Sequence, residues 1–280
     1  MKNLKVSLKL SLMCMLAIAS IVTKAQDEKA FTKKYLTKLP WLKALTAPVT
    51  YSMSAVYINE DIFGNFQGKT RMTGEYTSGL PGDSAVWNNV FMSVSNNADQ
   101  DFPAGTKLNY MEGFRYFPGE GMVTEKELFR NFPSGPENIF ARNLIWDMYS
   151  FEIFAWQFYD SLKLNIPYVI NKPGQFNMAG IGNYSHDKMI FTWVGVTTMN
   201  NELCSVIEFT TLNNKLDISM DVVKTKGTEQ YWGSVYVSTK SRRIEKGVMY
   251  SGTVQQIEIK GLKDSFIMRT IRELEVNRIL

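Results

Sequence analysis

The chain has 280 residues, of which 45% are hydrophobic and 21% charged, with 31 Lys and Arg against 27 Asp and Glu and a formal net charge of +4. One His and two Cys exclude a zinc site built from paired His ligands or from thiolates alone. We therefore expect no metal and no other cofactor.

Residues 1–25 have the pattern of a cleavable secretory signal peptide. Three Lys residues open it, residues 10–22 form an apolar stretch, and small residues lead to a cleavage site near Ala25/Gln26. The stretch is short for a membrane span, which makes an uncleaved anchor the less favoured alternative. Cys14 lacks the small preceding residue of a lipobox. We expect an exported protein, periplasmic or extracellular, that is soluble after cleavage and does not span a membrane.

Cleavage would change the charge and the thiol content of the mature chain. The removed segment holds four Lys and no acidic residue, so 27 basic and 27 acidic residues remain and the formal net charge is zero. Nucleic-acid binding needs a basic surplus, and we expect none. Cys204 is the only Cys left, so no internal disulfide can form, and its strand-like context predicts a buried, unreactive thiol. Residues 26–280 are expected to form a single β-rich domain.

The first elements after the signal are a short helix and several strands. Apolar residues at spacings of three and four predict an amphipathic helix over residues 27–46, which Pro40 breaks or kinks. Alternating apolar and polar residues predict strands at 49–55, 66–76 and 85–95, and a further strand is expected at 108–117.

A long apolar helix is predicted in the middle of the chain. Pro136 and Glu137 resemble a helix start, and residues 137–160 are apolar on most of their circumference. Such a helix is buried rather than half-exposed. Polar interruptions such as Arg142 and Asp147 argue against a membrane span. We expect this helix to lie against, or inside, a curved sheet.

The C-terminal part is predicted to be a meander of antiparallel strands from Tyr184 onward. Turns are expected at Asn200-Asn201, at Asn213-Asn214, at residues 239–242 and at residues 261–264. The predicted fold class is mainly β (α+β): a curved antiparallel sheet or incomplete β-barrel, with an N-terminal helix and one long apolar helix packed on the concave face.

No sequence motif in the chain names a reaction. A Ser-His-Asp triad could use only His186, which we interpret as a solvated loop residue next to Asp187, and there is no Gly-x-Ser-x-Gly elbow. Two carboxylates that are distant in sequence can still meet in space, so a carboxylate-based hydrolase stays open. We expect no catalytic residues and no enzymatic activity.

The mature chain is rich in aromatic side chains and Met. All 17 Phe, 13 Tyr and 6 Trp lie after residue 25. Such residues line adaptable apolar pockets, although plain core packing also uses them. The expected pocket-lining residues are Trp146, Phe154, Trp156 and Trp193.

One C-terminal hairpin resembles a recurring element of a known superfamily. Residues 227–238 read GTEQYWGSVYVS and are followed by a charged turn and IEKG at residues 244–247. This pattern and the order of elements resemble the periplasmic lipoprotein-carrier (Lol-type) superfamily. The compositional style also resembles that of uncharacterised exported Bacteroidetes-like families. The carrier resemblance implies an incomplete β-barrel whose concave face, plugged by helices, binds acyl chains. This chain is longer than typical carriers.

Three functions follow from these observations. The favoured one is an exported protein that binds an apolar, lipid-like small molecule or acyl chain in a half-barrel pocket. The alternatives are a carboxylate-based hydrolase and a non-enzymatic envelope-assembly or interaction protein, whose protein partner the sequence does not identify. Two acidic residues in one cleft would favour the hydrolase.

Overall fold

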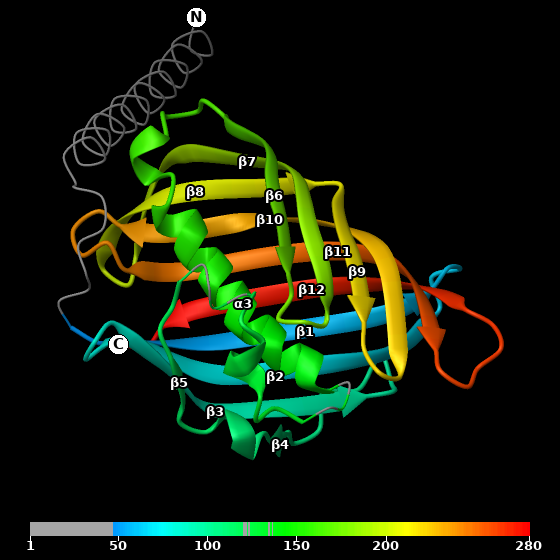
Figure 1. Cartoon of the computed structure of the whole chain (residues 1–280). Helices are drawn as coiled ribbons and strands as arrows, with labels where there is room; N and C mark the ends of the chain where they lie inside the picture. Colours follow the sequence, from blue (N-terminus) through cyan, green and yellow to red (C-terminus); the bar gives the residue numbers. More distant parts are fainter. Residues whose placement is uncertain (1–46, 120–121, 123, 134, 136) are drawn as a thin grey trace, which may run out of the picture.

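The computed structural model describes residues 47–119, 122, 124–133, 135 and 137–280. The predicted signal peptide at 1–25 and the predicted helix at 27–46 lie outside these residues. The described chain is dominated by one antiparallel sheet of twelve strands, with helix α3 (Glu137–Trp156) lying across one face (Figure 1). The predicted mainly β class is confirmed.

The strands follow the chain in order. They are β1 (Val49–Asp61), β2 (Phe66–Leu80), β3 (Ser84–Ser95), β4 (Thr106–Lys107), β5 (Phe114–Tyr116), β6 (Tyr168–Asn177), β7 (Gly182–Met199), β8 (Glu202–Leu212), β9 (Asn214–Ser219), β10 (Val223–Ser238), β11 (Ile244–Ile259) and β12 (Phe266–Arg278). Short 3₁₀ turns are η1 (Asn109–Met111), η2 (Lys126–Phe129) and η3 (Tyr159–Ser161).

The sheet runs in the order β4-β3-β2-β1-β12-β11-β10-β8-β7-β6, with β5 beside β3 and β9 between β10 and β7. Most neighbours are consecutive in the chain, as in a meander. The pairings of β3 with β5, β7 with β9 and β8 with β10 skip one strand each. The pairing of β1 with β12 spans the greatest distance along the chain and brings the first and last strands together in the middle of the sheet. We call the face of the sheet that packs against α3 the inner face.

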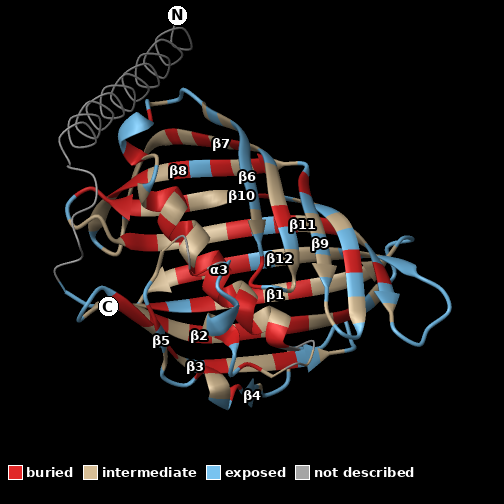
Figure 2. Cartoon of the chain, viewed as in Figure 1, coloured by how far each residue is buried: buried red, intermediate tan, exposed pale blue. Residues whose placement is uncertain are grey.

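Helix α3 is buried on several sides, as its apolar circumference predicts. Phe151 and Phe154 pack on Phe209 of β8, and Phe154 also stacks on Tyr231 of β10. Figure 2 shows buried positions gathered on α3 and on the strands beneath it. Within the described residues, no helix has the length and apolar character needed to cross a membrane.

The helix ends earlier than the sequence pattern predicts. The predicted range was 137–160, whereas α3 ends at Trp156. Phe158 has φ −113° and ψ 7°, outside the helical region, and the chain then enters η3. There Tyr159 OH lies 3.2 Å from Ser205 Oγ of β8. Tyr159 is therefore buried by a tertiary contact and not as part of the helix.

The predicted turn at Asn213-Asn214 is wrong, because β8 and β9 lie end to end between β7 and β10. Asn213 adopts φ +56°, a conformation that Asn tolerates, and breaks the strand without reversing it. At the break, Thr211 Oγ1 accepts hydrogen bonds from Asn214 Nδ2 at 2.7 Å and from the backbone N of Tyr231 at 3.2 Å. The chain reverses instead at residues 220–222.

Candidate functional site

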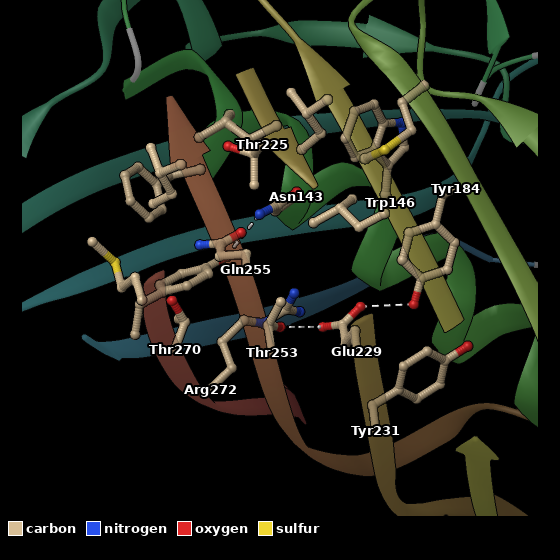
Figure 3. A pocket seen from close by; sticks show the side chains of 18 of the residues that line it. Asn143, Trp146, Tyr184, Thr225, Glu229, Tyr231, Thr253, Gln255, Thr270 and Arg272 are labelled. Carbon is tan, nitrogen blue, oxygen red and sulfur yellow. Dashed lines mark hydrogen bonds between the residues drawn. The ribbon is translucent and has the colours of Figure 1, made fainter. Parts of the chain in front are cut away.

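A cavity of about 480 Å³ lies between α3 and the inner face of the sheet. Its walls come from α3 and from strands β1, β6, β7, β9, β10, β11 and β12 (Figure 3). Most of the lining is apolar and includes four Met residues, namely Met178, Met220, Met249 and Met268. A concave, mostly apolar pocket with a few polar groups is the usual form of a small-molecule site.

Strand register sorts the cavity lining into rows. Successive side chains on a strand point to opposite faces, so residues two apart share the inner face. One cross-strand row consists of Glu229, Thr253, Thr270 and Asn59, and the next consists of Tyr231, Ser251, Arg272 and Tyr57, of which Ser251 does not line the cavity. These two polar rows lie on a face whose other lining positions are mostly apolar.

We call one end of the cavity its mouth. The mouth is formed by the cross-strand rows that lie on one side of the two polar rows. The mouth is lined mostly by apolar residues, Val223, Ile257, Ile259, Phe266 and Met268, with Thr225 and Gln255 among them. Phe266 is 38% exposed, whereas Thr225 and Ile257 in the same row are 7% and 9% exposed. The exposed edge of the mouth at Phe266 is therefore separated from the polar rows by buried side chains.

We name the deep polar groups the polar band, which comprises Asp147, Tyr184, His186, Glu229, Tyr231, Thr253 and Arg272. They converge from α3, β7, β10, β11 and β12. Figure 3 shows Tyr184, Glu229, Thr253 and Arg272 close together at one part of the cavity.

An ion pair within the polar band joins the sheet to α3. Arg272 Nη2 lies 2.6 Å from Asp147 Oδ1, and the two side chains are only 12% and 11% exposed. Burial raises the pKa of Asp147, and the neighbouring Arg272 opposes that rise. Among the described residues, Asp147 Oδ2 and Arg272 Nε have no hydrogen-bond partner. Unpaired polar atoms in a buried position cost free energy. These two atoms therefore leave hydrogen-bonding capacity unused beside the cavity.

Glu229 accepts two hydrogen bonds from hydroxyl groups. Tyr184 OH donates to Oε2 at 2.7 Å, and Thr253 Oγ1 donates to Oε1 at 3.4 Å. Burial, together with the nearby Glu229 carboxylate, holds the pKa of Tyr184 well above its usual value. Tyr184 therefore stays protonated and serves as a donor to Glu229.

His186 corrects the prediction of a solvated loop residue. It lies in β7, lines the cavity and has Nε2 2.7 Å from Tyr231 OH. Burial lowers the pKa of His186 to about 4, with Glu229 opposing the shift, so the ring is neutral at pH 7. The sequence neighbour Asp187 is exposed and does not line the cavity.

The four predicted lining residues fall in different places. Trp146 lines the cavity. Phe154 packs in the core among Phe191, Phe209 and Tyr231 and is not part of the lining.

The other two Trp residues also lie outside the lining. Trp156 Nε1 donates to the carbonyl oxygen of Arg242 at 2.9 Å, and Trp193 is 1% exposed with its Nε1 donating to the carbonyl oxygen of Gly195 at 2.7 Å. The N–H group of each indole therefore already donates a hydrogen bond to a backbone carbonyl.

The remaining reactive groups offer little chemistry. Cys204 is buried, as predicted, and burial raises its pKa to about 12. Across the part of the chain that the structure describes, no cluster of three or more His, Cys, Asp or Glu side chains could hold a metal ion. Of the residues that the structure describes, Asp147 and Glu229 are the two acidic ones that line the cavity.

Sequence reasoning missed the polar band, although one signal was available. In β12 the alternate positions Met268, Thr270, Arg272, Leu274 and Val276 share one face. A strand that places Arg among apolar inner positions indicates a buried charge, and a buried charge requires a partner. The identity of that partner, Asp147, depends on where α3 crosses the sheet.

No protein-family model and no curated protein matches the chain. Among solved structures, lipovitellin, described for its lipid–protein interactions, aligns at 14% identity and a TM-score of 0.41 over 83% of this chain, which spans 25% of the lipovitellin chain. A DUF1329 family protein from Desulfovibrio piger aligns at 9% identity and a TM-score of 0.16, over 91% of this chain and 92% of that one. TM-scores this low do not establish a common fold, so the cavity itself must carry any functional conclusion.

Proposed function

We propose that this protein binds an apolar, lipid-like ligand in a half-barrel pocket between α3 and the inner face of the sheet. The observation that carries the proposal is the cavity of about 480 Å³ with its largely apolar lining. Ligand pockets for small molecules span roughly 300–1,000 Å³, so the volume suits one such ligand. Flexible Met side chains in the wall suit a ligand of variable shape.

The proposed setting is outside the cytoplasm. The signal-like pattern at residues 1–25 supports export, and a neutral mature chain suits an apolar ligand better than a polyanion. A binding protein of this kind would keep an insoluble molecule out of water, because burying apolar surface is favourable.

A substitution that fills the mouth tests the proposal. Ile257 is buried in the mouth, and Ile257→Trp would place an indole in the cavity. We expect the affinity for a neutral solvent-sensitive naphthylamine dye to fall by about tenfold or more, because each 1.4 kcal/mol of lost contact is about tenfold. Fluorescence titration of the purified protein measures this, and native mass spectrometry reports any lipid that co-purifies.

The neighbouring residue supplies the matched control. Glu258 lies on the same strand but is exposed on the opposite face, so Glu258→Trp adds the same indole without entering the cavity. We expect wild-type dye binding from this variant. Equal dye binding by wild type and both variants, or no dye binding at all, would show that the cavity holds no apolar ligand.

A carboxylate-based hydrolase is the second candidate function, because Asp147 and Glu229 line one cavity. The ion pair of Asp147 with Arg272 and the two hydrogen bonds to Glu229 give each carboxyl a structural role as well. Turnover of a chromogenic ester or glycoside that Glu229→Gln abolishes would favour hydrolysis over binding.

A further inference from the structure

The polar band carries an excess of negative charge. The lining contains two carboxylates, Asp147 and Glu229, and one guanidinium, Arg272. Arg272 contacts Asp147, which leaves Glu229 without an ion-pair partner among the described residues. His186 adds no compensating charge, since burial lowers its pKa to about 4. An anionic group brought into this low-dielectric site would face repulsion that water screens poorly.

The hydrogen bonds of the polar band leave both acceptors and donors for a ligand. Tyr184 and Thr253 have each given their single hydroxyl hydrogen to Glu229, so only lone pairs on their oxygens remain. Asp147 Oδ2 is a further acceptor with no partner among the described residues. The donors without a hydrogen-bond partner there are Arg272 Nε, Arg272 Nη2 and Trp146 Nε1, and Nη2 is held in the ion pair with Asp147. A head that donates hydrogen bonds to the acceptors and adds no negative charge to the two carboxylates fits this set.

The order of the rows orients such a ligand. The polar band lies beyond the mouth, which is lined mostly by apolar residues such as Val223, Ile259 and Phe266, although Thr225 and Gln255 also line it. If an amphiphile bound with its polar head at the mouth, the head would make no hydrogen bonds to the polar band. Its apolar tail would then lie against the charged groups of the band. Entry of the head first matches polar with polar and apolar with apolar.

We propose that the cavity selects amphiphiles with a non-anionic, hydrogen-bond-donating head, of the long-chain amine or alcohol class, and binds them with the head inward at the polar band. This inference rests on the proposed function and specifies its ligand class. Fatty acids, and lipids whose head is a phosphate or sulfate, are disfavoured by the same charge balance.

Three amphiphiles of one chain length test the inference on the wild-type protein. Tetradecylamine, tetradecanol and tetradecanoate are titrated against the bound naphthylamine dye, the ionic two below their micelle concentrations and the alcohol below its solubility limit. We expect the amine and the alcohol to displace the dye at concentrations about tenfold or more below that of the carboxylate, because like charges brought together inside a site are costly. Equal displacement by all three, or strongest displacement by the carboxylate, would overturn the head selectivity while leaving the apolar cavity intact. Failure of the dye and of every amphiphile to bind would instead contradict the proposed function.

A charge-neutral variant locates the head. Glu229→Gln keeps an acceptor of similar shape, and we expect it to weaken amine binding about fivefold to tenfold while changing alcohol binding by less than about twofold. Glu258→Gln, exposed on the outer side of β11, is the matched control and should leave both unchanged. A thermal melt checks that each variant is folded. If Glu229→Gln fails to fold, the comparison of the three amphiphiles on the wild-type protein decides the inference. Equal loss of amine and alcohol binding would place the head elsewhere.

Discussion

Glu152 is a charged side chain buried on α3, as are Arg142 and Asp147. Tyr76 OH donates to its Oε1 at 2.9 Å, and within the described part of the chain no cation forms an ion pair with it. Burial raises the pKa of Glu152 from 4.5 to about 7, and the hydrogen bond from Tyr76 only partly opposes the rise. This carboxyl therefore titrates close to neutral pH.

The stability of the protein should reflect that titration. Because the folded-state pKa is raised, the contribution of Glu152 is fully present below the unfolded pKa of 4.5 and is lost as pH rises through about 7. One pKa unit corresponds to about 1.4 kcal/mol, so the loss is at most about 3–4 kcal/mol. We expect Glu152→Gln to remove this part of the decline in the free energy of unfolding, measured by denaturant titration at about pH 5 and pH 8.

The difference between wild type and variant isolates Glu152, since other buried groups titrate in both proteins. The exposed Glu258→Gln should follow the wild-type pH dependence. An identical pH dependence in wild type and Glu152→Gln would show that Glu152 keeps an ordinary pKa.

The contact between α3 and the sheet depends on one glycine in β11. Gly247 lies on the inner face, and a Cβ built there would be 2.6 Å from Cε1 of the Phe151 ring. A distance this short is impossible for real atoms, so the absence of a side chain lets the helix rest directly on the strand. The height of α3 above the sheet, and hence the space left for the cavity, depends on this residue.

Gly247→Val should destabilise the protein by about 1–3 kcal/mol, because overpacking a filled core forces the helix or the strand to move. Gly252 of the same strand provides the control, since a Cβ there meets nothing within 4 Å. Gly252→Val should be neutral or slightly stabilising, because Val favours strands. Urea unfolding measures both, and equal effects would mean that Phe151 does not require Gly247.

Elements with regular patterns were predictable, and those set by distant partners were not. The alternation in β2 predicted its buried face, and Met72 and Tyr76 are buried as expected. The turn at Asn200-Asn201 is confirmed, with both residues at positive φ. Strands were predicted at 216–223 and 231–238 but not at residues 224–230, because polar side chains such as Lys224 and Lys226 hide a pattern that only pairing with β9 and β11 stabilises.

At the scale of the whole molecule, the pairing of β1 with β12 assembles the cavity. It places Tyr57 next to Arg272 in register, with the guanidinium 5.3 Å from the Tyr ring centroid. Helix α3 then brings Asp147 onto Arg272 from above. The site is thus made of segments from the beginning, the middle and the end of the described chain, and a ligand that binds it should stabilise the fold as a whole.

A ligand that binds only the folded state raises stability by mass action, about 2.7 kcal/mol at a hundredfold excess over Kd. For a domain of this size, we expect tetradecanol at such an excess to raise Tm by about 5–10 °C, at about 2–4 °C per kcal/mol. Differential scanning fluorimetry or calorimetry measures the shift. The Ile257→Trp variant should show about half that rise or less, because a tenfold weaker affinity lowers the stabilisation to about 1.4 kcal/mol at the same ligand concentration. A rise equal to that of wild type would place the bound ligand outside the cavity.

The sequence by itself determined the local features: the mainly β class, the buried character of the central helix, the burial of Cys204 and the abundance of aromatic and Met side chains. These follow from periodicity and composition, which act over a few neighbouring residues. Only the tertiary structure decided that β8 and β9 are collinear, that His186 is half-buried in the cavity wall, and that Asp147, Glu229 and Arg272 meet in one cavity. The reason is physical: a buried charge is tolerated only beside its partner, and partners far apart in the chain are chosen by strand register and helix placement.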